Sequence, residues 1–318
     1  MYTENAAKDI KIFAKALLTN QLARFTPSLW VTFSQETGRG RAESDSGEVA
    51  DYFRMCFREH FQQIGMNEAD AGEYLKGKRV LEYGPGDILG VALLMYAHGA
   101  EAVQCVDRFP LRKSSEKNLE VYRKLLDGLE GAQRERAANA FAVPGHPESG
   151  FNPNAIAYRV TPDGLSGGER EFDLIISRAV LEHVNNLEKT MADIAAALKP
   201  HGISVHQVDL KSHGLDRYKT YDFLTWPDPL YRLMYSHKGF PNRWRIDKYR
   251  NAIRLAGLAL SKLAPTGLVA SEEIAIIRPG LDRKFRDIPP EELAWLGFWM
   301  VLDHPARADA TLAQAASP

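Results

Sequence analysis

The stretch "VLEYGPGDILG", residues Val80 to Gly90, decides the fold. It opens with an apolar run that contains the carboxylate Glu82, and three glycines follow within seven residues. Glycine allows a backbone to turn sharply and to pass close to a ligand, because it has no side chain. The stretch therefore predicts a strand that runs into a glycine turn with a helix after it, which is the context of a nucleotide-binding loop.

The spacing of the glycines narrows the class of nucleotide. The pattern is Glu82-x-Gly84-x-Gly86-x-x-x-Gly90, whereas a dinucleotide fingerprint would place its third glycine at position 89, which is Leu89. A carboxylate two residues before the first glycine would also repel a pyrophosphate. A ligand with an ammonium or sulfonium group would tolerate it, so the pattern disfavours an NAD-dependent oxidoreductase.

Short apolar runs alternate with helical stretches from residue 79 onward. The predicted strands are "RVLEY" (79–83), "AVQCVD" (102–107), "AIAYRV" (155–160), "FDLIIS" (172–177), "ISVHQV" (203–208) and "GFWMVLD" (297–303). Helices are expected over 88–98, 118–139, 187–198 and 246–258. Alternating strands and helices indicate an α/β fold with a doubly wound, parallel sheet.

The first seventy residues are predicted to be helical. Apolar residues recur at helical spacing in two sets, Ile10, Phe13, Leu17 and Leu18, and then Val49, Phe53, Phe57, Phe61 and Ile64. We expect residues 1–70 to form a helical cap or lid that covers the cofactor cleft or forms the contact of a homodimer. Residues 71–305 form the main domain, and 306–318 a flexible tail.

Composition excludes several classes of partner. The 318 residues are 45% apolar and 25% charged with a net charge of −1, which argues against nucleic-acid binding by bulk electrostatics. No apolar run approaches the roughly 20 residues that span a bilayer, so no membrane partner is expected. The cysteines, Cys56 and Cys105, lie in apolar patterns and are expected to be reduced, as in a cytoplasmic protein.

A second carboxylate completes a recognisable pattern. Asp107 ends the second predicted strand, 21 residues after Gly86, where it can accept both hydroxyls of a ribose. With "FDLIISRAVLEHV" (172–184) and "LKPHGISV" (198–205), this pattern resembles the class I S-adenosylmethionine-dependent methyltransferases of the small-molecule type over residues 75–303. The resemblance implies a Rossmann-like, mostly parallel seven-stranded sheet with an N-terminal helical appendage, and S-adenosyl-L-methionine as cofactor.

The same resemblance assigns the residues that would hold the cofactor. They are Glu82, Gly84, Gly86, Gly90, Asp107, Arg108, Ser177 and Arg178. Many relatives hold the adenine with an Asp just after the third strand. Here that position is Thr161, so Asp163 or the backbone of Gly164 are the alternatives.

Acceptor-side candidates follow the fourth and fifth strands, because open α/β sheets bind ligands at the carboxyl ends of their strands. We expect His206, Asp209 and His183 to be catalytic, and Arg178, Gln207 and His213 to contact the acceptor. An aromatic and basic insertion at about 211–245 would cover the mouth of the site. This insertion adds four acceptor candidates: Tyr235, Asn242, Arg243 and Arg245. Its two arginines would either bind a carboxylate or phosphate of the acceptor or form ion pairs that tie the insertion to the core.

The predicted activity is methyl transfer to the oxygen, nitrogen or thioether sulfur of a small polar, carboxylate-bearing metabolite. The alternatives are an RNA or nucleobase methyltransferase and a non-catalytic nucleoside-binding module. A base-amine motif of the Asn/Asp-Pro-Pro-aromatic kind is not found after strand four, where the sequence is "SRAV" (177–180). The spacing His206-x-x-Asp209-x-x-x-His213 resembles a metal triad, but nothing else supports it, and no metal is predicted.

Overall fold

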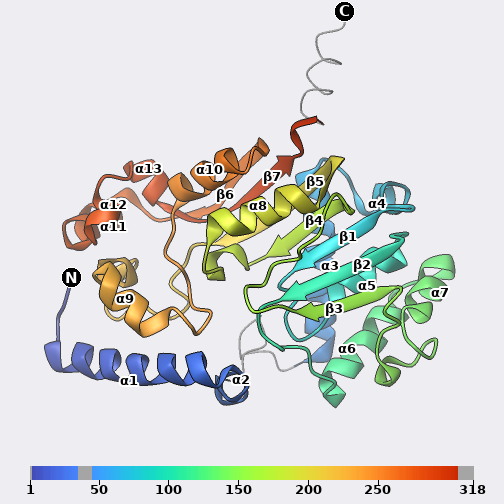
Figure 1. The fold of residues 1–318 in the computed structure, drawn as a ribbon, viewed down its shortest axis with the longest axis horizontal. Coiled ribbons are helices and arrows are strands. Elements are labelled where there is room, and N and C mark those ends of the chain that lie inside the picture. Colours follow the sequence, from blue (N-terminus) through green and yellow to red (C-terminus); the bar gives the residue numbers. More distant parts are fainter. Residues whose placement is uncertain (1, 35–44, 307–318) are drawn as a thin grey trace, which may run out of the picture.

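A computed structural model describes residues 2–34 and 45–306 (Figure 1), so the predicted tail lies outside the described residues from position 307 onward. Within the described residues, seven strands form one sheet in the order β3-β2-β1-β4-β5-β7-β6. Strands β1 to β5 are parallel, and β7 runs antiparallel to both β5 and β6. The doubly wound, mostly parallel sheet expected from the sequence is confirmed.

Six of the strands lie where the sequence predicts them. Their bounds are β1 (Arg79–Tyr83), β2 (Ala102–Asp107), β3 (Ile156–Val160), β4 (Phe172–Arg178), β5 (Leu198–Asp209) and β7 (Trp295–Asp303). The strand that was missed is β6 (Ala259–Leu268), at the edge of the sheet. Its sequence contains Pro265 and Gly267, and its pairing with β7 shifts register at both, so the alternation that marks a strand is broken.

Helices cover both faces of the sheet (Figure 1). One face carries α3 (Ser46–Gln63), α5 (Gly90–Ala97), α6 (Glu116–Asp127) and α7 (Gly131–Asn139), with α4 (Glu68–Leu75) beside α3; the other carries α8 (Leu187–Ala197) and α10 (Ile246–Leu255). The single helix expected over 118–139 is therefore two helices. Gly128 caps the first, and Gly131 starts the second with a φ of +48°, a value that favours glycine.

Helix α3 belongs to the main core. Its apolar stripe is buried at Val49, Phe53, Phe57 and Phe61, among the side chains of α5 and the sheet. The Asp45 carboxylate caps the helix by accepting hydrogen bonds from two backbone N–H groups of the first turn. The predicted periodicity is confirmed for this helix.

Two hydrophobic cores lie under the helices on the two faces of the sheet, and a third core lies beside the sheet. It combines α9 (Asp228–Tyr235), which follows β5, with three short helices between β6 and β7: α11 (Ser271–Ile277), α12 (Arg283–Arg286) and α13 (Pro290–Leu293). Its apolar side chains include Phe223, Tyr231, Met234 and Leu293. The insertion predicted at about 211–245 thus packs against a second segment, 269–294, that the sequence did not single out.

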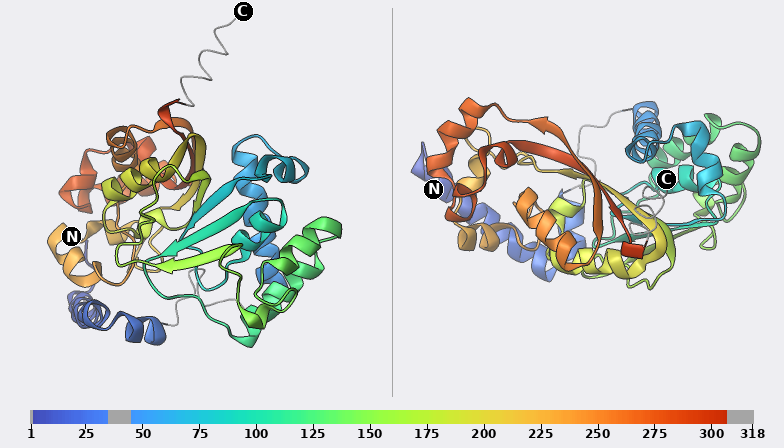
Figure 2. Two further views of the ribbon diagram at one scale, coloured as in Figure 1. Left: turned by 45° about the vertical axis from the view of Figure 1, so that its right-hand side comes forward. Right: turned by 90° about the horizontal axis from the view of Figure 1, so that it is seen from above.

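Helix α1 (Ala6–Phe25) lies along α9 and leads into α2 (Pro27–Ser34), and both views in Figure 2 place α1 apart from the helices that cover the sheet. Its buried face consists of Asp9, Ala16, Asn20 and Ala23. Ile10 and Leu18, which the sequence suggested as part of an apolar face, are 69% and 72% exposed. Among the described helices, none is long and apolar enough to cross a membrane.

Candidate functional site

A cavity of about 780 Å³ opens at the carboxyl ends of β1, β2, β4 and β5. The order of the strands reverses between β1 and β4, and such a switch point is where open α/β sheets bind ligands. Eleven predicted site residues line the cavity: Gly84, Gly86, Asp107, Arg108, Asp163, Gly164, Arg178, His183, Gln207, Asp209 and His213. The fold therefore brings the cofactor and acceptor candidates to one place.

The glycine turn after β1 forms one wall. Gly84 and Gly86 have φ values of +60° and +78°, which side chains rarely adopt. A Cβ atom at position 84 would lie 2.5 Å from Cγ2 of Val180, a residue that also lines the cavity. Only glycine permits this approach between the turn after β1 and the loop after β4.

Asp107 presents a free carboxylate oxygen at the end of β2. Its Oδ1 accepts backbone hydrogen bonds from Arg108 at 2.7 Å and Phe109 at 3.2 Å. Its Oδ2 is buried and makes no hydrogen bond within residues 2–34 and 45–306. Burial raises the pKa of this carboxyl group to about 6, against the opposing effect of the backbone N–H groups. A buried acceptor without a donor is costly, so the position fits a ligand that donates hydroxyl protons.

Two residues of the glycine motif lie elsewhere than expected. Glu82 does not line the cavity: its buried carboxylate accepts a long contact of 3.8 Å from Cys105 Sγ, on the neighbouring strand β2. Burial raises the pKa of Glu82 to about 8, so it is mainly protonated at neutral pH. Gly90 begins α5 against Phe53, whose ring a Cβ atom at position 90 would overlap.

The wall beyond β3 contains the adenine candidates. Gly164 has a φ of +70° and packs against Arg108, and Asp163 binds Lys189 at 2.6 Å. Thr161 is outside the lining because its hydroxyl donates to the Leu165 carbonyl at 3.0 Å. The structure thus brings Asp163 and Gly164, but not Thr161, to the cavity.

At the ends of β4 and β5, neighbouring residues point in different directions. Arg178, Gln207 and Asp209 line the cavity, whereas Ser177 and His206 do not. His206 Nδ1 lies 2.7 Å from the Ser177 hydroxyl inside the sheet core, and burial lowers the pKa of the imidazole to about 3. The expected catalytic position of His206 is therefore corrected: it lies in the core and cannot reach the cavity.

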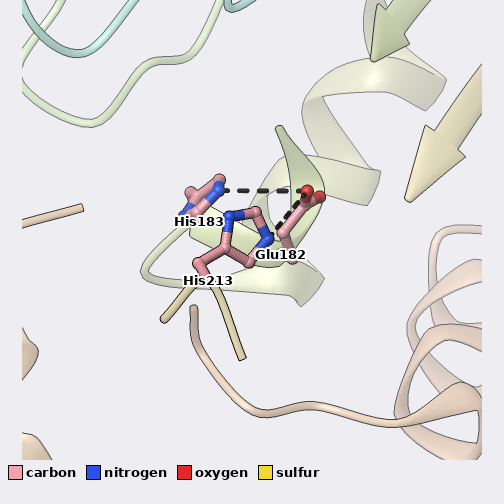
Figure 3. A group of neighbouring side chains, drawn as sticks. All are labelled: Glu182, His183 and His213. Carbon is pink, nitrogen blue, oxygen red and sulfur yellow. Dashed lines mark ion pairs between the residues drawn. The ribbon is translucent and has the colours of Figure 1, made fainter. Parts of the chain in front are cut away.

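The side chains of Glu182, His183 and His213 lie close together, as Figure 3 shows, and the two histidines also line the cavity. Glu182 and His183 belong to a 3-10 turn, Leu181–His183, and His213 lies in the loop after β5. His183 Nε2 and His213 Nε2 lie 3.9 Å and 4.0 Å from Glu182 Oε1. Burial lowers the pKa of His183 to about 3 and raises that of Glu182 well above its usual range.

Four of the predicted acceptor residues lie in protein contacts away from the cavity: Tyr235, Asn242, Arg243 and Arg245. The Arg243 guanidinium donates to the backbone of Phe223 and Trp226 and to Asp228. The fully buried Arg245 guanidinium donates to four acceptors: the carbonyls of Leu210, Leu293 and Trp295, and the Tyr221 hydroxyl. Tyr235 packs against Phe240, and Asn242 bonds the turn at Leu181 and Val184. These residues hold the insertion to the core.

The cover of the cavity includes residues that the sequence did not identify. Trp30 and Val31 come from α2, and Tyr52 from α3. Lys238 and Phe240 come from the loop after α9, and Lys238 Nζ donates to the Ala16 carbonyl at 3.0 Å. The sequence predicted a lid formed by residues 1–70 without naming the side chains that would face the cavity, which here come from α2 and α3.

Comparisons with known proteins found one matching family model and several solved structures of similar fold. The chain matches a family model described as "Methyltransferase domain" over residues 59–263. It is similar in fold to an S-adenosylmethionine-dependent methyltransferase from Mesorhizobium loti, with 17% identity and a TM-score of 0.42, covering 72% of this chain and 92% of that one. It is also similar in fold to phosphoethanolamine N-methyltransferase 2 from Haemonchus contortus, with 14% identity and a TM-score of 0.40, covering 72% of this chain and 49% of that one. Among curated proteins, no sequence match was found.

The family model spans more than half of the chain, from α3 into β6, and so includes the glycine turn, Asp107 and the loops after β4 and β5. The unpartnered Asp107 oxygen and the open glycine turn fit the cofactor of that family. The chain belongs to the methyltransferase domain family and is a class I S-adenosylmethionine-dependent methyltransferase.

Proposed function

We propose that the protein transfers a methyl group to the oxygen, nitrogen or thioether sulfur of a small polar metabolite. One observation carries this proposal: a single cavity contains the unpartnered Asp107 oxygen at one end and the Asp209 and His213 side chains at the other. A cofactor held at the first end would therefore face an acceptor held at the second. Alignment of two reactants in one site is the main source of rate in such a transfer.

At the cofactor end, Gly84 and Gly86 let the backbone approach the ligand, and Asp107 accepts hydrogen bonds from ribose hydroxyls. Asp163 and Gly164 lie at the edge where the adenine is expected. The bound S-adenosylmethionine supplies an activated methyl group on a positively charged sulfur.

At the acceptor end, Asp209 is our choice for the group that takes a proton from an acceptor hydroxyl or amine. Its side chain is 24% exposed, and its Oδ2 lies 3.8 Å from the Lys211 ammonium group. An acceptor thioether would need no such base. Of the three arginines predicted to contact the acceptor, Arg178 alone lines the cavity. Arg178 and Lys211 are therefore our choice for the cations that would favour a carboxylate-bearing acceptor.

The size and cover of the cavity support a small acceptor. Its volume of about 780 Å³ is typical of small-molecule sites, which measure roughly 300–1,000 Å³. Trp30 and Phe240 close it with aromatic side chains. The net charge of −1 supports the expectation that nucleic acid is not the substrate. Cys56 and Cys105 are buried free thiols, which supports a reducing, cytoplasmic setting.

Calorimetry with S-adenosylmethionine and with NADH tests the cofactor, and a metabolite screen for release of S-adenosylhomocysteine tests the activity. We expect the protein to bind S-adenosylmethionine and not NADH. With an identified acceptor, Asp209→Asn should lower kcat at least tenfold and leave cofactor affinity unchanged, whereas Asp127→Asn at an exposed site should change neither. No binding at about 100 μM S-adenosylmethionine, or methylation of RNA alone, would contradict the proposal.

A further inference from the structure

The cluster of Glu182, His183 and His213 has a donor set that the methyl transfer does not require. The candidate ligand atoms of these three side chains all lie within 4.8 Å of one another. Figure 3 shows the two imidazoles on the same side of the carboxylate, each joined to it by a dashed ion-pair line.

Glu182 is the unusual member of this cluster. Its side chain is 2% exposed, and neither carboxylate oxygen has a hydrogen-bond partner in the described structure. Nδ1 of His183 is likewise buried without a partner. Burying a carboxylate away from water costs several kcal/mol or more unless a donor or a cation faces it. The side chain is therefore aimed at a position where a positive charge would be stabilised.

We propose that Glu182, His183 and His213 bind a divalent cation of the Zn²⁺ or Co²⁺ type. Two imidazoles and one carboxylate are ligands that these borderline cations accept, whereas Mg²⁺ prefers oxygen ligands alone. Two ligands that are each about 2.1 Å from a shared ion are at most about 4.2 Å apart. The observed separations of 3.9 Å and 4.0 Å lie inside that limit, and small side-chain rotations would bring all three together.

The backbone around the cluster is held in place by residues outside it. Asn242 donates from Nδ2 to the carbonyls of Leu181 and Val184, and its backbone N–H donates to the Glu182 carbonyl at 2.6 Å. His213 has a φ of +50°, an unusual conformation for a residue other than glycine. A cation would compensate for the cost of holding His213 in this conformation.

The position of the cluster gives the cation a role in acceptor binding, and this step rests on the proposed function. His183 and His213 line the acceptor end of the cavity, next to Asp209. A cation bound by three protein ligands keeps coordination positions open, and here these positions would face the cavity. They would suit an acceptor with an oxygen anion, such as a carboxylate or an ionised hydroxyl.

The test is metal binding by the untagged full chain in the absence of cofactor and acceptor. We expect one Co²⁺ per chain, with a visible absorption band from nitrogen and oxygen ligands, and displacement of Co²⁺ by Zn²⁺. Glu182→Gln and His213→Gly should each weaken binding at least tenfold, and glycine accepts the φ at position 213. The matched control is His146→Ala, which removes a surface histidine paired with Glu148 at 2.9 Å and should leave binding unchanged.

The cluster would be a hydrogen-bonded group without a metal if the chain bound no Co²⁺ or Zn²⁺ at about 100 μM, or if neither variant weakened binding. An equal loss in the His146→Ala control would also overturn the site. If Glu182→Gln failed to fold, as judged by circular dichroism, the His213→Gly result would decide. S-adenosylmethionine affinity, measured by calorimetry in the same variants, should stay within about threefold of wild type. This measurement distinguishes the loss of metal binding from the loss of cofactor binding.

Discussion

The end of β2 and the third core both bury charged side chains, but they use them in opposite ways. Asp107 keeps one carboxylate oxygen without a partner, at the wall of the cavity. Arg245 directs its guanidinium at the carbonyl oxygens of Leu210, just after β5, and of Leu293 and Trp295, at the end of α13 and the start of β7. The third core contains much irregular backbone, whose carbonyls need donors once they are buried. Arg245 also has a buried Nε without a partner among the described residues, but it does not line the cavity. A buried charge near a strand end thus marks a ligand site where its unpartnered atom belongs to a residue that lines a cavity, as at Asp107.

The strongest way to test this contrast is to remove Arg245. Arg245→Met should lower the free energy of unfolding by about 3 kcal/mol or more, because several buried acceptors lose a charged donor at once. Denaturant unfolding measures the effect, with Arg254→Met on the exposed face of α10 as the control. A variant as stable as wild type that has lost acceptor affinity would restore Arg245 to the binding site.

Gly90 belongs to the predicted binding motif but packs like a core residue. Gly90→Ala should destabilise the fold by about 1–3 kcal/mol, because the added Cβ overlaps the Phe53 ring. The matched control is Gly72→Ala inside α4, where a Cβ atom would make an ordinary contact of 3.5 Å with the His98 carbonyl. Thermal unfolding separates the two variants. If Gly90→Ala instead unfolded like wild type and bound cofactor poorly, Gly90 would belong to the ligand side of the comparison.

Asp107 should show the reverse pattern. Asp107→Ala should weaken S-adenosylmethionine binding by about 1–3 kcal/mol and change stability little. Because the carboxyl group is ionised only above about pH 6, the wild-type affinity should fall as the pH drops below 6, and the variant should lack this fall. Calorimetry over pH 5–8 measures both effects, with Asp127→Asn as the control. An affinity that Asp107→Ala left unchanged would remove Asp107 from the cofactor site.

The effect expected at Glu82 is smallest at acid pH and appears only as the pH rises. Its pKa is about 8 in the folded protein against 4.5 as the ordinary value, so between these values the unfolded chain is ionised while the folded protein keeps its proton. Stability therefore falls as the pH rises from about 5 to 8. Glu82→Gln should leave stability near wild type at pH 5 and flatten this decline. A marked loss of cofactor affinity in Glu82→Gln would return the residue to the binding site.

The structural features predicted best from the sequence were those that depend on a local pattern of residues. The bounds of β1 and β2 were correct because buried parallel strands form nearly continuous apolar runs, and the glycine turn and Asp107 follow directly from those ends. The face of the sheet toward which each strand residue points could not be predicted in the same way. Gln207 faces the cavity and His206 the core, and a difference of one position in a strand reverses a side chain.

Packing between distant segments decided the remaining differences. The buried face of α1 is polar because Asn20 bonds the backbone of Leu233 and His237, which no periodicity in α1 indicates. The arginines of "NRWR" (242–245) could have faced a ligand or the core, and only the position of 269–294 fixed the answer. The pairing of Glu182 with His213 likewise depends on a loop thirty residues away.

The docking of α1 on α9 has a consequence for the order in which the chain is built during translation. Roughly two hundred residues separate the two helices, so α1 leaves the ribosome long before its binding surface exists. Its buried face combines the polar Asp9 and Asn20 with the small Ala16 and Ala23. The partners of these polar side chains, Arg217, Leu233 and His237, also lie about two hundred residues further along the chain. Asp9 and Asn20 therefore stay without their protein partners until that part of the chain has been made.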